Sequence, residues 1–81
     1  MAKSFTLSIA KLTENIFEGR VLSVTVPGEE GVLTILASHE ALVTPLKEGT
    51  ISYTPEEGAS QSLAIERGIV EVSDNHVTVL L

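Results

Sequence analysis

The side chains that could carry out acid–base or metal chemistry lie mostly between Gly28 and Gly49. This stretch, GEEGVLTILASHEALVTPLKEG, holds the acidic pair Glu29-Glu30 and His39, one of 2 histidines in the chain. A single histidine is a poor zinc site when no ligand follows at helical spacing and the chain has no cysteine. On the residue pattern alone, His39 is more simply a solvated loop histidine.

Two acidic pairs, Glu29-Glu30 and Glu56-Glu57, could be taken for catalytic carboxylates. Adjacent residues on a strand or turn point apart, so neither pair is placed to share a proton or hold a substrate. The chain also shows no activated nucleophile, metal cluster or phosphate-binding loop. We therefore predict a protein that is not an enzyme and uses no cofactor. Both pairs are interpreted as solvated turns, and Glu29-Glu30 could also meet basic groups on a partner.

Length and charge exclude several other classes. At 81 residues, the chain is predicted to be a single domain over 1–81. The 5 basic and 11 acidic residues give a formal charge of −6, which argues against binding to nucleic acid or to an anionic membrane surface. The apolar runs are far shorter than the roughly 20 residues that span a bilayer, so no direct membrane insertion is expected. The N-terminus alternates like a strand and does not resemble a signal peptide.

The elements that position these residues are predicted to be strands, because apolar and polar residues alternate along nearly the whole chain. A short strand at Ile16-Phe17 is expected to end at Gly19, and Leu22, Val24 and Val26 are expected to face inward on the next strand. His76 is predicted to be an exposed strand residue. Turn residues recur at short intervals, and no window shows a helical period. The predicted fold is all-β: a small two-layer β-sandwich or flattened barrel of about eight to ten short strands.

Three apolar residues, Leu36, Val43 and Leu80, do not fit the inward-facing pattern. One interpretation is that a neighbouring loop covers them. If they cluster on the outside instead, they form an exposed apolar patch, which on a small domain usually marks a partner surface.

Taken together, three motifs resemble the N-terminal β-sandwich domain of the epsilon subunit of F-type ATP synthases, which is called delta in mitochondria. The likeness covers essentially the whole chain. The first motif is Phe17-Glu18-Gly19. The second begins at Gly31–Leu36 and continues through His39, Leu42 and Thr44 to Lys47-Glu48-Gly49. The third is Gly68–Val72, followed by Asn75 and Val77–Leu80.

The resemblance implies a non-catalytic central-stalk subunit that links the gamma subunit to the c-ring and couples proton or sodium flow to ATP synthesis. It would lie at the cytoplasmic face of the bacterial inner membrane, attached through the c-ring. By position, the resemblance implies that His39, Leu42 and Thr44 contact gamma. It places the c-ring contact at Glu29, Glu30, Gly31 and Val32.

The sequence departs from the family pattern at several points. Val32 stands where many relatives carry an acidic residue near the c-ring, and Glu29 and Glu30 are expected to supply that charge instead. Ala37-Ser38 replaces the usual proline-containing turn before the histidine, which leaves the turn less rigid. The sequence stops at Leu81, so the family's C-terminal helical hairpin, a brake on ATP hydrolysis, is not expected here.

An alternative from another class is a free-standing β-domain that binds a ligand or carries a lipoyl or biotinyl group. Lys47 at a hairpin-like turn would be the attachment site. It lacks the flanking residues that such carrier modules show.

Overall fold

The computed structural model describes residues 3–38 and 41–81. These residues form eight β-strands and no helix, so none of them lies in a helix that could cross a membrane. The strands are β1 (Phe5–Lys11), β2 (Glu14–Gly28), β3 (Gly31–Leu36), β4 (Leu42–Leu46), β5 (Gly49–Pro55), β6 (Gln61–Ile65), β7 (Gly68–Ser73) and β8 (His76–Leu80). The all-β prediction is confirmed.

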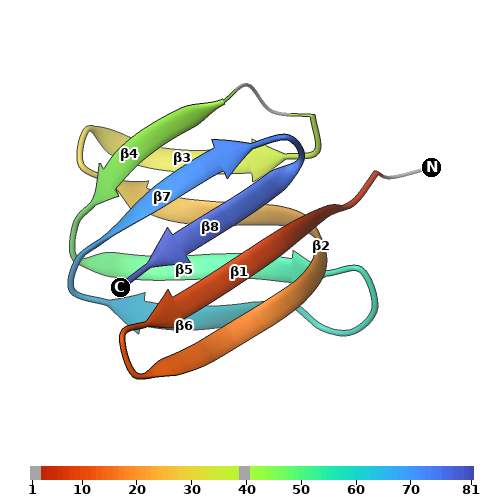
Figure 1. Cartoon of the computed structure of the whole chain (residues 1–81), viewed down its shortest axis with the longest axis horizontal. Helices are drawn as coiled ribbons and strands as arrows, with labels where there is room; N and C mark the ends of the chain where they lie inside the picture. Colours follow the sequence, from red (N-terminus) through yellow and green to blue (C-terminus); the bar gives the residue numbers. More distant parts are fainter. Residues whose placement is uncertain (1–2, 39–40) are drawn as a thin grey trace.

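The strands form two layers that cross each other (Figure 1). The front layer has the order β4, β7, β8, β1 and the N-terminal half of β2, and the back layer has the order β3, β2, β5, β6. β1 and β8 run parallel, whereas the other neighbouring strands are antiparallel. The result is the predicted flattened barrel, in which each strand turns one face to a shared core.

The long strand β2 belongs to both layers, and the prediction of two strands separated at Gly19 was wrong. β1 pairs with β2 on both sides of this glycine, from Lys11 opposite Glu14 to Phe5 opposite Val21. A Cβ at Gly19 would lie 3.2 Å from the Phe17 ring, so the glycine makes room for that ring. Gly19 therefore marks a site of close packing within the strand and not its end.

The prediction that Leu22 faces inward was also wrong. Val21 pairs with Pro55 and Ser23 with Thr54, so Leu22 is an extra residue in the ladder between β2 and β5. Such a bulge shifts the alternation by one residue. As a result Val21 and Val24 are both fully buried, while Leu22 is only half-buried.

The core between the layers is entirely apolar among the described residues, since no polar or charged side chain is buried. The Phe17 and Tyr53 rings add a tilted aromatic contact, with centroids 4.5 Å apart. The largest fully buried side chains are Phe5, Leu7, Ile9, Ile35, Ile51, Val21, Val24, Val26, Val70, Val77 and Val79. Burial of each such side chain stabilises the fold by about 1.5–3 kcal/mol. Interiors of this kind are close-packed, so the sandwich is a stiff support for its surface residues.

Candidate partner-binding site

The Glu29-Glu30 pair forms the two-residue turn of the hairpin between β2 and β3. Gly28 and Gly31 pair directly on either side of it. Gly31 has a φ of 144°, a conformation that side chains rarely allow. A Cβ at Gly28 would lie only 2.6 Å from the Gly31 carbonyl oxygen. The two glycines thus make the tight turn possible, and both glutamates are exposed on it, as predicted.

The turn is attached to the end of β4 by main-chain hydrogen bonds. The Glu29 amide donates to the Pro45 carbonyl (3.0 Å), and the Lys47 amide donates to the Pro27 carbonyl (2.9 Å). The acidic turn and the end of β4 are therefore held together as one unit, although Glu29 and Pro45 lie 16 positions apart in the sequence.

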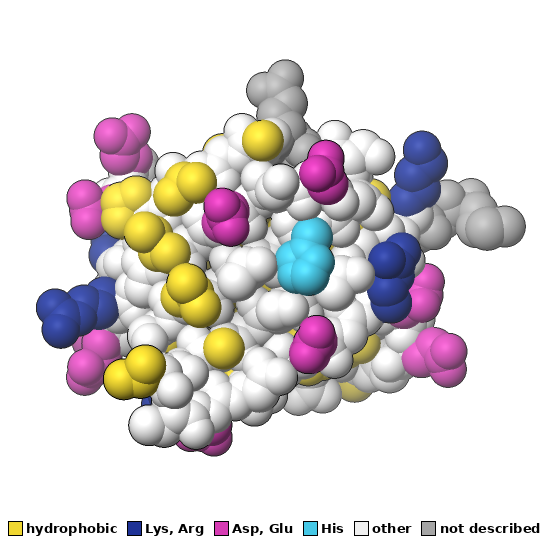
Figure 2. Space-filling model, viewed as in Figure 1, with side chains coloured by type: hydrophobic (Ala, Val, Ile, Leu, Met, Phe, Trp, Pro, Cys, Tyr) yellow, Lys and Arg dark blue, Asp and Glu magenta, His cyan; other side chains and the backbone are white. Residues whose placement is uncertain are grey.

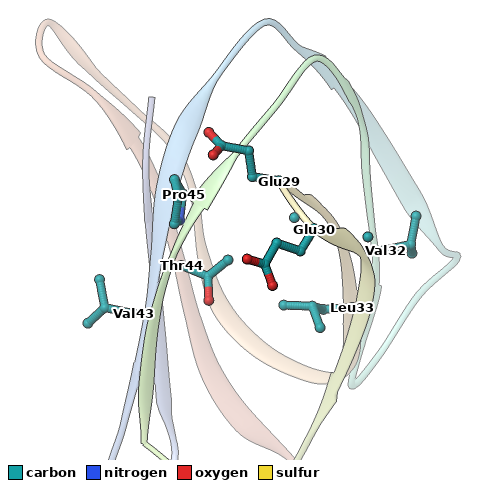
Figure 3. Close-up of a pocket in the computed structure, with 9 residues that line it drawn as sticks. Glu29, Glu30, Val32, Leu33, Val43, Thr44 and Pro45 are labelled. Atoms are coloured by element: carbon teal, nitrogen blue, oxygen red, sulfur yellow. The ribbon is translucent and has the colours of Figure 1, made fainter.

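An open groove of about 500 Å³ lies between the β2–β3 hairpin and β4. In Figure 3 the side chains of Glu30, Leu33 and Thr44 point toward one another across it, whereas Val43 and Val32 point away. A carboxylate and a hydroxyl beside an apolar wall suit a lysine or arginine side chain, whose stem is apolar and whose end donates charged hydrogen bonds. Among the described residues, no three His, Asp or Glu side chains are grouped to hold a metal ion.

The groove brings together residues that were predicted for two different interfaces. Glu29, Glu30 and Gly31 line it from the hairpin, and Thr44 lines it from β4. Val32 is 70% exposed at the rim, but its side chain points away from the groove in Figure 3. Glu29 and Glu30 are close to Val32 in sequence, but their carboxylates lie on a different side of the hairpin from the Val32 side chain.

Two further predicted contact residues are placed less favourably. Leu42 is half-buried and packs against the hydrophobic core, so only part of it is free for a partner. His39 lies outside the described residues.

Lys47, the candidate carrier lysine, is exposed in the turn between β4 and β5.

A second surface lies on the outer face of the front layer. Pro45, Ile69, Leu80 and Ala10 are successive cross-strand neighbours on β4, β7, β8 and β1. Together with Val43 we call these residues the apolar row. Val43 is 62% exposed and Leu80 is 54% exposed. Figure 2 shows apolar side chains gathered along one side of this face, with acidic side chains and a histidine over the remainder.

Leu36, Val43 and Leu80 are all exposed, but only Val43 and Leu80 share a face. Leu36 is 55% exposed on β3, in the back layer. Ile69, which is 40% exposed beside Leu80, was not among the predicted residues. Its alternation with the buried Val70 and Val72 marks it as outward-facing, but only the register between β7 and β8 places it beside Leu80.

His76 is exposed on β8, as predicted, and its Nε2 lies 3.3 Å from the Ser8 hydroxyl on the parallel strand β1. Glu71, Ser73 and Asp74 lie around it on the same part of the surface. This part of the front face is polar, so it borders the apolar row with groups that prefer water.

The stiff β-sandwich thus offers two surfaces suited to contact with other proteins, an acidic groove and an exposed apolar row. Residues 4–81 match the family model described as "ATP synthase, Delta/Epsilon chain, beta-sandwich domain". The chain belongs to this family, which confirms the resemblance seen in the sequence.

Known proteins support this assignment. The chain is 43% identical to the ATP synthase epsilon chain of Sulfurimonas denitrificans over 77 residues, which are 93% of this chain and 59% of the relative. It superposes on a chain of the Euglena gracilis mitochondrial ATP synthase with a TM-score of 0.88 and 26% identity, covering 95% of this chain and 49% of that chain. The central stalk and c-ring structure from Tetrahymena thermophila contains a chain with the same fold, with a TM-score of 0.82, 18% identity and coverage of 96% and 63%. This chain thus spans about half to two thirds of the length of these proteins.

Proposed function

We propose that this chain acts in the central stalk of an F-type ATP synthase as a non-catalytic link between the gamma subunit and the c-ring, coupling ion flow to ATP synthesis. The observation that carries the proposal is that two partner surfaces share one strand. On β4, the Thr44 side chain points into the groove, while its neighbours Val43 and Pro45 belong to the apolar row. A load applied at one surface would thus pass through β4 and the packed core to the other.

The groove is proposed as the c-ring contact. Its carboxylates and the formal charge of −6 suit a polar loop that carries basic groups. Because Glu29 and Glu30 are exposed, their charges would act mainly on the rate of encounter and less on the lifetime of the complex.

The apolar row is proposed as part of the gamma contact, together with the predicted contact residues His39, Leu42 and Thr44. The Thr44 side chain lines the groove, so Thr44 would lie where the two contacts meet. Large apolar side chains that are exposed together lose unfavourable contact with water when a partner covers them. In this arrangement the subunit lies at the cytoplasmic face of a bacterial inner membrane and is attached through the ring, with protons or sodium ions as the coupling ion.

The 43% identity to an epsilon chain and the absence of carrier-type residues around Lys47 favour this function over a lipoyl or biotinyl carrier. A carrier lysine would show the mass of its attached group after expression in cells, and we expect the unmodified mass.

The test is binding of the chain to a purified gamma and c-ring subcomplex, followed by surface plasmon resonance. We expect Leu80→Ser to speed dissociation by about tenfold, since a central apolar contact is typically worth 1 kcal/mol or more. Glu30→Gln should slow association several-fold at low salt, and added salt should remove the difference.

Matched controls lie outside both surfaces. Leu36→Ser removes a 55% exposed leucine from β3 in the back layer, and Glu57→Gln removes a charge from the turn between β5 and β6. Neither should change the kinetics. If the unaltered chain does not bind the subcomplex, or if the controls have the same effect as Leu80→Ser and Glu30→Gln, the proposed function is wrong.

A further inference from the structure

The outer edge of β6 is open within the described part of the chain. β6 pairs only with β5 there, in an unbroken register from Gln61 opposite Tyr53 to Ile65 opposite Gly49. In Figure 1 it forms the end of the back layer. Proteins normally protect such edges with proline, charged residues or a bulge, because unpaired N–H and C=O groups attract further strands. Residues 61–65 contain no proline and no charge, and their pairing shows no bulge.

The edges of β3 and β4 differ from that of β6. They border the groove, where Glu29 and Glu30 lie at the turn, and β4 contains Pro45. The β4 edge is also tied to β2 by the pair Gly28 and Leu46. The β4 edge therefore carries features that hinder strand addition, and the β3 edge borders the groove proposed for the c-ring, whereas β6 lies at the other end of the back layer.

The back layer is uncharged along all of its strands. Residues 21–28, 31–36, 49–55 and 61–65 include none of the 5 basic and 11 acidic residues of the chain. A cross-strand row of small hydroxyl residues, Thr34, Thr25, Ser52 and Ser62, runs across its outer face to β6. An added strand with small neutral side chains would continue this row without opposing charge.

The inner face of β6 also fits a further strand. Ile65 is 7% exposed, but Leu63 is only half-buried although it packs against the core. An apolar residue on a neighbouring strand would cover the rest of Leu63, since cross-strand pairs are the contacts that stabilise a sheet.

We propose that β6 is a strand-addition site for an extended segment of the gamma subunit, in which apolar residues alternate with small uncharged ones. The identity of the partner rests on the proposed function. A second copy of this chain is a poorer occupant, because a formal charge of −6 repels its copy. Pairing along five residues also falls short of the roughly 1,200 Å² that a stable interface buries. A segment of a chain already held at the apolar row needs less, because the second contact is intramolecular.

Hydrogen–deuterium exchange of the free chain and of its complex with gamma and the c-ring tests the proposal. We expect outward-facing amides within residues 61–65 to exchange at least about a hundredfold more slowly in the complex. Ser62→Lys and Ala64→Lys, which place charge on the edge, should abolish this protection. Ser52→Lys is the matched control, because Ser52 is the neighbour of Ser62 one strand further in. It should leave the protection intact.

The alternative outcomes are distinct. Unchanged exchange over 61–65 in a complex that forms normally would overturn strand addition and leave the proposed function standing. Equal loss of protection in Ser52→Lys and Ser62→Lys would show that the partner docks on the outer face of the back layer, which also overturns it. A dimer of the free chain in sedimentation, with 61–65 protected, would show pairing between copies. Failure of the unaltered chain to bind would count against the proposed function itself.

Discussion

Replacing Asn75 by alanine should destabilise the whole domain, although the residue is exposed at the turn between β7 and β8. Its side-chain oxygen accepts a hydrogen bond from the Ser38 amide (2.9 Å), and its side-chain nitrogen donates to the Ser4 carbonyl (3.1 Å). Its own carbonyl accepts from the Thr6 amide (3.2 Å). Asn75 thus joins the hairpin to the segment after β3 and to the start of β1.

The magnitude follows from the two side-chain bonds and the backbone conformation. Each hydrogen bond contributes about 0.5–1.5 kcal/mol net, and exposure favours the lower end of that range. Asn75 has a φ of 61°, which asparagine tolerates and which costs alanine about 1 kcal/mol more. The sum is about 2 kcal/mol. For a domain of this size, that corresponds to a melting temperature lower by roughly 8–16 °C.

Thermal and urea unfolding, followed by circular dichroism, would measure the effect. Asn75→Gly restores freedom at positive φ but still lacks both side-chain bonds, so it should lose about 1 kcal/mol less than Asn75→Ala. Asn75→Asp keeps the acceptor for Ser38 but places a carboxylate against the Ser4 carbonyl, so it should fall between wild type and alanine. Asp74→Asn is the control and should be neutral, because it keeps a residue that tolerates the φ of 48° at the neighbouring position.

Two results would refute this reasoning. If Asn75→Ala unfolds within about 0.3 kcal/mol of wild type, the two hydrogen bonds contribute nothing measurable. If Asn75→Gly and Asn75→Ala are equally destabilised, the backbone conformation is not part of the cost.

Three further predictions concern packing. Gly68→Ala should cost about 1–3 kcal/mol in urea unfolding, because its Cβ would lie 2.7 Å from the Leu80 carbonyl oxygen; an unchanged midpoint would contradict this. Ile35→Ala should cost about 2–5 kcal/mol and Ile35→Val about 0.5–1.5 kcal/mol, since the side chain is fully buried; equal losses would show that the site collapses around the smaller residue. Phe17→Leu and Tyr53→Leu, combined in a double-mutant cycle, should give a coupling energy of about 0.5–1.5 kcal/mol from their ring contact, and additive losses would exclude it.

The fold class could be read from the chain because its cause is local. Strand residues such as Phe5, Leu7 and Ile9 alternate with polar neighbours, and the side chains of a strand alternate between two faces. The acidic turn was also visible, since a glycine on each side of Glu29-Glu30 permits a tight reversal. These features depend on residues that are close in sequence.

The errors occurred where strand pairing outweighs the local pattern. Gly19 looked like a strand end, but pairing with β1 on both sides of it keeps β2 continuous. Leu22 looked inward-facing, but the bulge opposite β5 moves Val21 into the core instead. Neither follows from the local pattern, because each depends on another strand: Leu7 on β1 lies opposite Gly19, and Pro55 on β5 lies opposite Val21.

The sequence by itself determined the strands, the turns, the acidic balance and the family motifs, since each rests on residue type and short spacing. Only the tertiary structure decided that Glu30 and Thr44 face one groove, that Ile69 extends the apolar row, and that Leu36 lies on the opposite layer. The physical reason is register: which residues share a surface depends on how distant strands align, and a shift of one residue would turn each side chain to the other face.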